Sequence, residues 1–139
     1  MATRQMTTTG LEMVAAATRP ADRHPAPVYL AHLAPGSRRT MRQALEVIAD
    51  LVSGGQIGAQ ALPWAQLRYQ HTQAIRAALA ERYSPSTANK MLSALRGVLK
   101  EAWRLGLLDA ESYQRAADLP AVRGSTLPAG RALSGAAFE

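Results

Sequence analysis

Apolar residues recur at helical spacing along most of this chain. Between residues 37 and 54 they fall at every third or fourth position, which is the spacing of one face of a helix. Ser37 precedes the run as an expected N-cap, and Gly54-Gly55 follows it as a stop signal. The pattern predicts a first strong helix whose buried stripe comprises Met41, Ala44, Leu45, Ile48, Leu51 and Val52.

The same reading predicts helices on both sides of this one. They cover residues 29–33, 63–83, 85–105 and 109–117. Ser84 and Pro85 supply an N-cap and a first helical residue for the longest of them, Gly106 ends it, and Asp109 caps the last. The buried stripe of the longest helix is expected to be Ala88, Met91, Leu92, Leu95, Val98, Leu99, Ala102 and Trp103.

The predicted fold class is all-α, a compact bundle of four to five helices with short connections. A chain of 139 residues has room for one domain of ordinary size. Residues 1–26 have the composition of a flexible leader, residues 27–120 carry the helical patterns, and residues 121–139 have linker composition followed by the start of another helix. His71 is expected as a partly buried core histidine, and Glu101 as solvated helix surface.

Charge and composition narrow the function. The net charge is +6, and 14 of the 16 basic residues are arginine, whose guanidinium group suits phosphate oxygens and guanine edges. An arginine-rich composition also arises from codon usage in a high-GC genome. There is no cysteine, no apolar stretch of about 20 residues, and no hydrophobic signal segment after Met1. We therefore expect a cytoplasmic protein with no membrane association.

The sequence offers no recognisable catalytic chemistry. The histidines lack the i, i+4 spacing that holds zinc on one helix face, no glycine-rich phosphate loop follows a strand, and the acidic residues are scattered. Ser37 and Ser84 are explained as helix caps. We expect no metal, no cofactor and no enzymatic activity in this chain.

Two helix starts combine cations with short polar side chains and are candidate DNA contacts. The first consists of Arg38, Arg39, Thr40, Arg42 and Gln43. The second consists of Ser86, Thr87, Asn89, Lys90, Ser93 and Arg96. Cations at a helix N-terminus oppose the helix dipole, which suggests that an anion arrives from outside. The alternative reading is an ordinary charged exterior.

Three strings together resemble a known family. They are Ser37-Arg38-Arg39-Thr40-Met41, Pro63-Trp64-Ala65-Gln66-Leu67, and the run from Ser84-Pro85-Ser86-Thr87 to Leu92-Ser93-Ala94-Leu95-Arg96. This pattern is similar to the N-terminal core-binding domain of tyrosine recombinases, the phage-type integrases, over about residues 26–120. There an S-x-x-T helix start is followed, some forty to fifty residues on, by an S-x-x-T helix containing L-S-A-L-R.

The resemblance implies a SAM-like four-helix domain that forms half of a C-shaped clamp around a double-stranded DNA recombination half-site. Two helices would cross the major groove, and the full-length protein would self-associate on DNA. Residues 124–130 would be the interdomain linker, and residues 133–139 the start of a catalytic domain that bears the tyrosine nucleophile. The tyrosines present here match no such motif, so none is assigned as nucleophile.

Two other readings remain open. The first is a helical protein-interaction or oligomerisation module with a basic face, in which Leu11, Met13 and Val14 of the leader act as an exchanging arm. The second is a helix-turn-helix transcription factor, which requires a three- to four-residue turn before its recognition helix. The segment Tyr83-Ser84-Pro85 provides such a turn only loosely.

Overall fold

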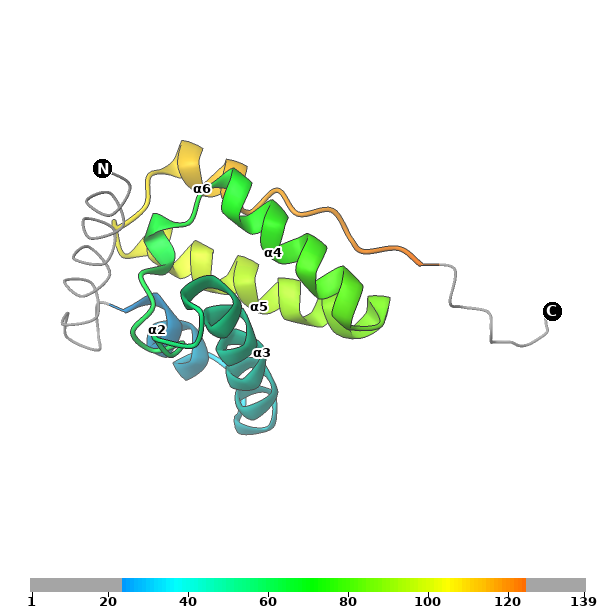
Figure 1. Cartoon of the computed structure of the whole chain (residues 1–139). Coiled ribbons are helices and arrows are strands. Elements are labelled where there is room, and N and C mark those ends of the chain that lie inside the picture. The colour runs from blue at the N-terminus through cyan, green and yellow to red at the C-terminus, as the bar shows by residue number, and fades with distance from the viewer. Residues whose placement is uncertain (1–23, 125–139) are drawn as a thin grey trace.

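The computed structural model describes residues 24–124, and these residues form helices and loops without any strand (Figure 1). The all-α prediction is confirmed for this part of the chain. In chain order the elements are α2 (Pro25–Ala31), α3 (Pro35–Ser53), the 3-10 turn η2 (Trp64–Gln66), α4 (Tyr69–Arg82), α5 (Pro85–Arg104) and α6 (Ala110–Ala116). The predicted leader and linker fall largely on residues 1–23 and 125–139, outside the described residues.

Helix α5 is the central element, because α2, α3, η2, α4 and α6 all contact it. In Figure 1, α4 and α5 diverge from a short connection as a narrow V, and α3 runs across α5. One broad face of α5 is buried and comprises Ala88, Met91, Leu92, Ala94, Leu95, Val98, Leu99, Glu101 and Ala102. The opposite face is polar and exposed, as in an amphipathic helix at the surface of a bundle.

Several helix boundaries follow from local signals in the sequence. The Ser84 side chain accepts a hydrogen bond from the Thr87 N–H, and Pro85 occupies the first turn of α5. The Asp109 side chain accepts from the Ser112 N–H at the start of α6. Gly54 and Gly106 follow α3 and α5 with φ of +66° and +78°, a conformation that glycine adopts without a steric penalty. These predicted caps and stops are confirmed.

The starts of α2, α3 and α4 differ from the prediction. Helix α2 spans Pro25–Ala31 instead of residues 29–33, with Pro25 at its first position. Helix α3 begins at Pro35 with Ala34 as N-cap, so Ser37 lies inside the first turn instead of capping it. Proline at the first helical position already has a suitable φ and lacks an N–H that would need a partner. Helix α4 begins at Tyr69, because η2 and an extended Leu67 intervene after Trp64.

Four predictions of burial or exposure are wrong. Val52, expected in the buried stripe of α3, is 36% exposed. His71 is exposed, and its Nδ1 accepts the Arg68 backbone N–H at 2.9 Å as part of a capping box on α4. Trp103 is 41% exposed and stacks on Tyr113 with ring centroids 5.7 Å apart. Glu101, expected at the surface, is buried and ion-paired.

The folded unit reaches both ends of the described range. Ala26 is completely buried, and α2 begins at Pro25. After α6 the chain continues as an extended strap, defined here as residues 118–124, in which Leu119 and Val122 are buried. None of the described helices combines the length and the apolar character needed to cross a membrane.

Candidate nucleic-acid interface

The first candidate segment is the α3 start, defined as residues 35–43. The side chains of Arg39, Thr40, Arg42 and Gln43 are exposed there. Within residues 24–124, no hydrogen bond or ion pair engages these four side chains. The first turn of α3 contains no acidic residue. The guanidinium groups of Arg39 and Arg42, the fifth and eighth residues of α3, therefore lie at the surface without a partner among the described residues.

Arg38 has a different role from its neighbours on α3. It is half-buried, its Nε donates to the Leu30 carbonyl oxygen at 2.9 Å, and its Nη2 donates to that of Leu33 at 2.9 Å. Leu30 lies in the last turn of α2, and Leu33 lies in the turn between α2 and α3. Arg38 therefore fixes the α3 start against α2. Beside this contact, a surface cleft of about 280 Å³ is lined in part by Arg38, Arg42 and Gln60.

Glu46 does not neutralise the arginines that precede it. It lies four residues after Arg42, where an ion pair across one helical turn is sterically accessible. Its Oε1 instead accepts the Ala59 backbone N–H at 3.1 Å. The described residues contain no ion pair to Arg42, so the positive charge of the α3 start is free to attract an external anion.

The second candidate segment is the α5 start, defined as residues 84–93. Ser86, Thr87, Lys90 and Ser93 are exposed, and Ser86, Lys90 and Ser93 share one helix face by their spacing. The Ser93 hydroxyl donates to the Asn89 carbonyl oxygen at 3.1 Å. This surface presents hydroxyl groups around one cation, Lys90.

The remaining two predicted DNA contacts on α5, Asn89 and Arg96, form hydrogen bonds with the strap. Asn89 Nδ2 donates to the Val122 carbonyl oxygen at 3.0 Å, and Asn89 Oδ1 accepts the Val122 N–H at 2.7 Å. Arg96 Nη2 donates to the Leu119 carbonyl oxygen. Asn89 and Arg96 are therefore not brought together with the exposed polar side chains of α5.

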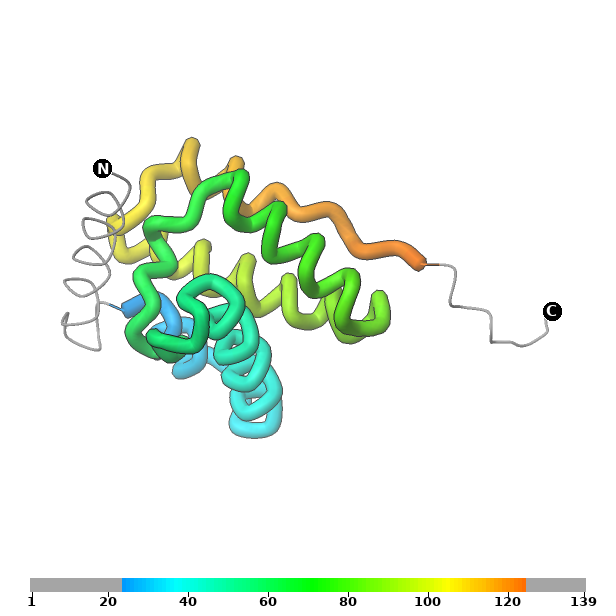
Figure 2. The backbone as a smooth tube through the Cα atoms, in the orientation of Figure 1, coloured from blue at the N-terminus to red at the C-terminus, as the bar shows by residue number. Residues whose placement is uncertain are grey.

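The α3 and α5 starts are separate surfaces, and α2 contacts α5 in its C-terminal half. In Figure 2 the start of α3 (cyan) and the start of α5 (yellow-green) lie at different ends of the bundle. Tyr29 of α2 packs against Gly97, which lies one turn beyond Ser93 on the same face of α5. The C-terminal end of α2 is in turn held by Arg38. Burial raises the pKa of the Tyr29 phenol, which keeps this connecting side chain neutral.

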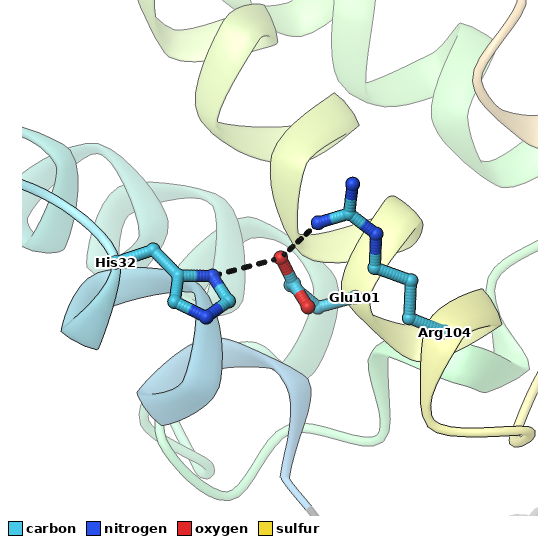
Figure 3. Close-up of polar contacts among 3 residues, drawn as sticks. All are labelled: His32, Glu101 and Arg104. Atoms are coloured by element: carbon cyan, nitrogen blue, oxygen red, sulfur yellow. Dashed lines mark hydrogen bonds and ion pairs between the residues drawn. The ribbon is translucent and has the colours of Figure 1, made fainter.

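A buried carboxylate anchors the turn that precedes α3 (Figure 3). Glu101 Oε2 lies 3.2 Å from His32 Nδ1 and 3.0 Å from Arg104 Nη1. His32 follows α2 directly, so this contact ties the α2–α3 turn to the C-terminal part of α5. Sequence reasoning missed the group because His32 and Glu101 are 69 residues apart.

Within residues 24–124, no group of three or more His, Cys, Asp or Glu side chains could hold a metal ion. We compared the chain with protein-family models, with curated proteins and with solved structures, and none of the three comparisons finds a match.

Proposed function

We propose that this chain is a duplex DNA-binding domain that contacts phosphate through the α3 start and polar groups through the α5 start. One observation carries the proposal. Arg39 and Arg42, the fifth and eighth residues of α3, are exposed without an acidic partner within residues 24–124, while Arg38 fixes that helix start to α2. Exposed, unpaired guanidinium groups on a fixed helix favour a polyanion.

The resemblance to tyrosine recombinases sharpens this proposal. Its two helix starts coincide with the exposed side chains of α3 and α5, apart from Arg38, Asn89 and Arg96, which make contacts inside the protein. On this proposal the chain is a SAM-like core-binding domain that grips a recombination half-site and catalyses nothing itself. Self-association on DNA would belong to the full-length recombinase.

Fluorescence anisotropy with a labelled duplex tests the proposal over a series of salt concentrations. Each neutralised phosphate contributes about 0.9 to the slope of log affinity against log salt. Replacing both Arg39 and Arg42 by alanine should lower the slope by about 1.8, and affinity at 0.15 M salt by roughly 30-fold. A parent chain that fails to bind duplex even at low salt contradicts the proposal.

A second candidate function, protein docking, has its own observation. An apolar cleft of about 220 Å³ lies between α3 and α4, lined by Leu51, Val52, His71, Ala74, Ile75 and Ala78. Val52 at its edge is 36% exposed. Sedimentation equilibrium distinguishes the two functions, because a stable oligomer that is indifferent to DNA favours protein docking.

The helix-turn-helix reading receives less support. Only Tyr83 and Ser84 separate α4 from α5, which is shorter than the turn that motif requires.

A further inference from the structure

The strap is held by its backbone along the whole stretch from Asp118 to Val122. Each of these five consecutive carbonyl oxygens accepts a hydrogen bond from a side chain of α4 or α5. Gln73 Nε2 donates to Asp118 at 2.8 Å, Arg96 Nη2 to Leu119, Arg76 Nε to Pro120 at 2.7 Å, Arg76 Nη2 to Ala121 at 3.0 Å, and Asn89 Nδ2 to Val122 at 3.0 Å. Four side chains on two helices thus bind one extended segment.

Side-chain burial secures the same segment. Leu119 is 5% and Val122 8% exposed, and the Val122 N–H donates to Asn89 Oδ1 at 2.7 Å. Ordering an extended segment costs about 1–2 kcal/mol per residue in backbone entropy. The hydrogen bonds and the two buried side chains offset that cost, so the position of Val122 on α5 is well defined.

The hydrogen bonds that hold the strap determine where the next residue lies. Val122 is bonded to Asn89, one turn into α5, and consecutive Cα atoms are about 3.8 Å apart. Arg123 is exposed and therefore emerges beside the α5 start. Figure 2 shows the described strap (orange) ending at the same end of the bundle as the start of α5.

We infer that Arg123 is a phosphate-contacting residue of the proposed DNA interface and that Asn89 is a positioning residue that places it there. The α5 start otherwise carries one exposed cation, Lys90, among its hydroxyl groups. A second cation delivered by the strap gives this surface the pair of positive charges that the α3 start has in Arg39 and Arg42. This inference rests on the proposed DNA-binding function.

Anisotropy titration of the full chain with a labelled random-sequence duplex tests the inference. Replacing Arg123 by alanine should lower affinity about fivefold at 0.15 M salt and reduce the salt slope by about 0.9. Arg123→Lys should retain most of the affinity, because a single phosphate contact needs mainly the charge. The matched control is Arg115→Ala, which removes the same charge from an exposed arginine of α6 paired with Glu111.

The positioning role of Asn89 has a separate readout. Asn89→Ala should lower affinity as much as Arg123→Ala does, and the double variant should bind no more weakly than either single variant. Circular dichroism should show the helical content of all variants unchanged. Additive losses contradict the positioning role of Asn89.

The outcomes distinguish a failure of the Arg123 inference from a failure of the proposed DNA binding. If the parent chain binds duplex and Arg123→Ala matches Arg115→Ala in affinity and salt slope, the inference is overturned while DNA binding stands. If the parent chain does not bind duplex at any salt concentration, both are overturned.

Discussion

The α3 start and the α5 start resemble each other in sequence and differ in how the fold uses them. At the α3 start, one arginine of three turns inward to hold α2, while Arg39 and Arg42 face solvent. At the α5 start, Asn89 bonds to the strap and the exposed side chains are mainly hydroxyls. A polar side chain at a helix start therefore indicates a ligand only when no segment of the protein already occupies it.

This contrast divides the proposed interface into two roles. The α3 start supplies charge, which provides affinity for phosphate irrespective of sequence. The α5 start supplies short hydroxyl groups, which can reach base edges as well as backbone oxygens. Each of the following changes either disturbs the contact between α2 and α5 or tests one of the two surfaces alone.

The largest effect is expected from Gly97→Ala, which acts where α2 meets α5. An added Cβ would lie 2.2 Å from Tyr29 Cε1, so the Tyr29 ring or α2 itself would have to move. Overpacking of this kind costs about 1–3 kcal/mol in the free energy of unfolding, and the shift should displace the α3 start as well. Urea denaturation measures the loss.

Gly36→Ala is the matched control, because a Cβ on Gly36 of α3 meets no atom within 4 Å. That variant should be as stable as the parent or slightly more stable. Equal unfolding free energies for the two alanine variants would contradict the close contact between α2 and α5.

The next effect separates adjacent arginines of the α3 start. Arg38→Ala removes two charge-assisted hydrogen bonds to carbonyls of Leu30 and Leu33, and should lower the unfolding free energy by about 2 kcal/mol. Arg39→Ala should leave stability within about 0.5 kcal/mol, yet lower duplex affinity about fivefold at 0.15 M salt. Thermal melts and anisotropy on both variants check that Arg38→Ala mainly lowers stability and Arg39→Ala mainly lowers duplex affinity. A stability loss in Arg39→Ala with none in Arg38→Ala contradicts these assignments.

A smaller effect is expected at the α5 start from Ser84→Ala. The Ser84 hydroxyl accepts the Thr87 N–H at 3.3 Å, and losing such a cap costs about 1 kcal/mol. Ser86→Ala, two residues on at an exposed position, should leave the melting temperature unchanged. If both serines prove equally dispensable for stability, Ser84 does not cap α5.

The smallest effect is a pH dependence at the start of α6. Hydrogen bonds from the side chain and backbone of Ser112 hold the pKa of the Asp109 carboxyl below its ordinary value of about 3.9. Its contribution to stability is therefore present above that value, and it is lost as the pH falls through the lower, folded-state pKa. Asp109→Asn retains a capping acceptor that does not titrate. The melting-temperature difference between parent and variant should shrink below about pH 4, and a constant difference contradicts the assignment.

The sequence predicted those parts of the fold that depend on neighbouring residues. Apolar spacing located α3 and α5, and the caps at Ser84 and Asp109 were confirmed because each cap acts within one turn. Glu101 was predicted incorrectly, since its burial depends on His32, which is 69 residues away in the chain.

The same limit applies to the candidate interface. The exposed positions of Arg39, Arg42 and Lys90 follow from their places opposite an apolar stripe. The hydrogen bonds between Asn89 and Val122 could not be predicted, because no local pattern shows that the chain returns across α5 after α6. The sequence of the strap, Asp-Leu-Pro-Ala-Val-Arg-Gly, also gives little sign that its backbone is bound by side chains of two helices.

The most direct test of the DNA interface is nuclear magnetic resonance titration of the ¹⁵N-labelled chain with an unlabelled duplex. The account predicts that amide shift changes concentrate at residues 36–43, at residues 86–93 and at Arg123, while α6 stays unchanged and the changes fade as salt is raised. Spectra that do not change at saturating duplex, or changes confined to α6 and the cleft between α3 and α4, would contradict it.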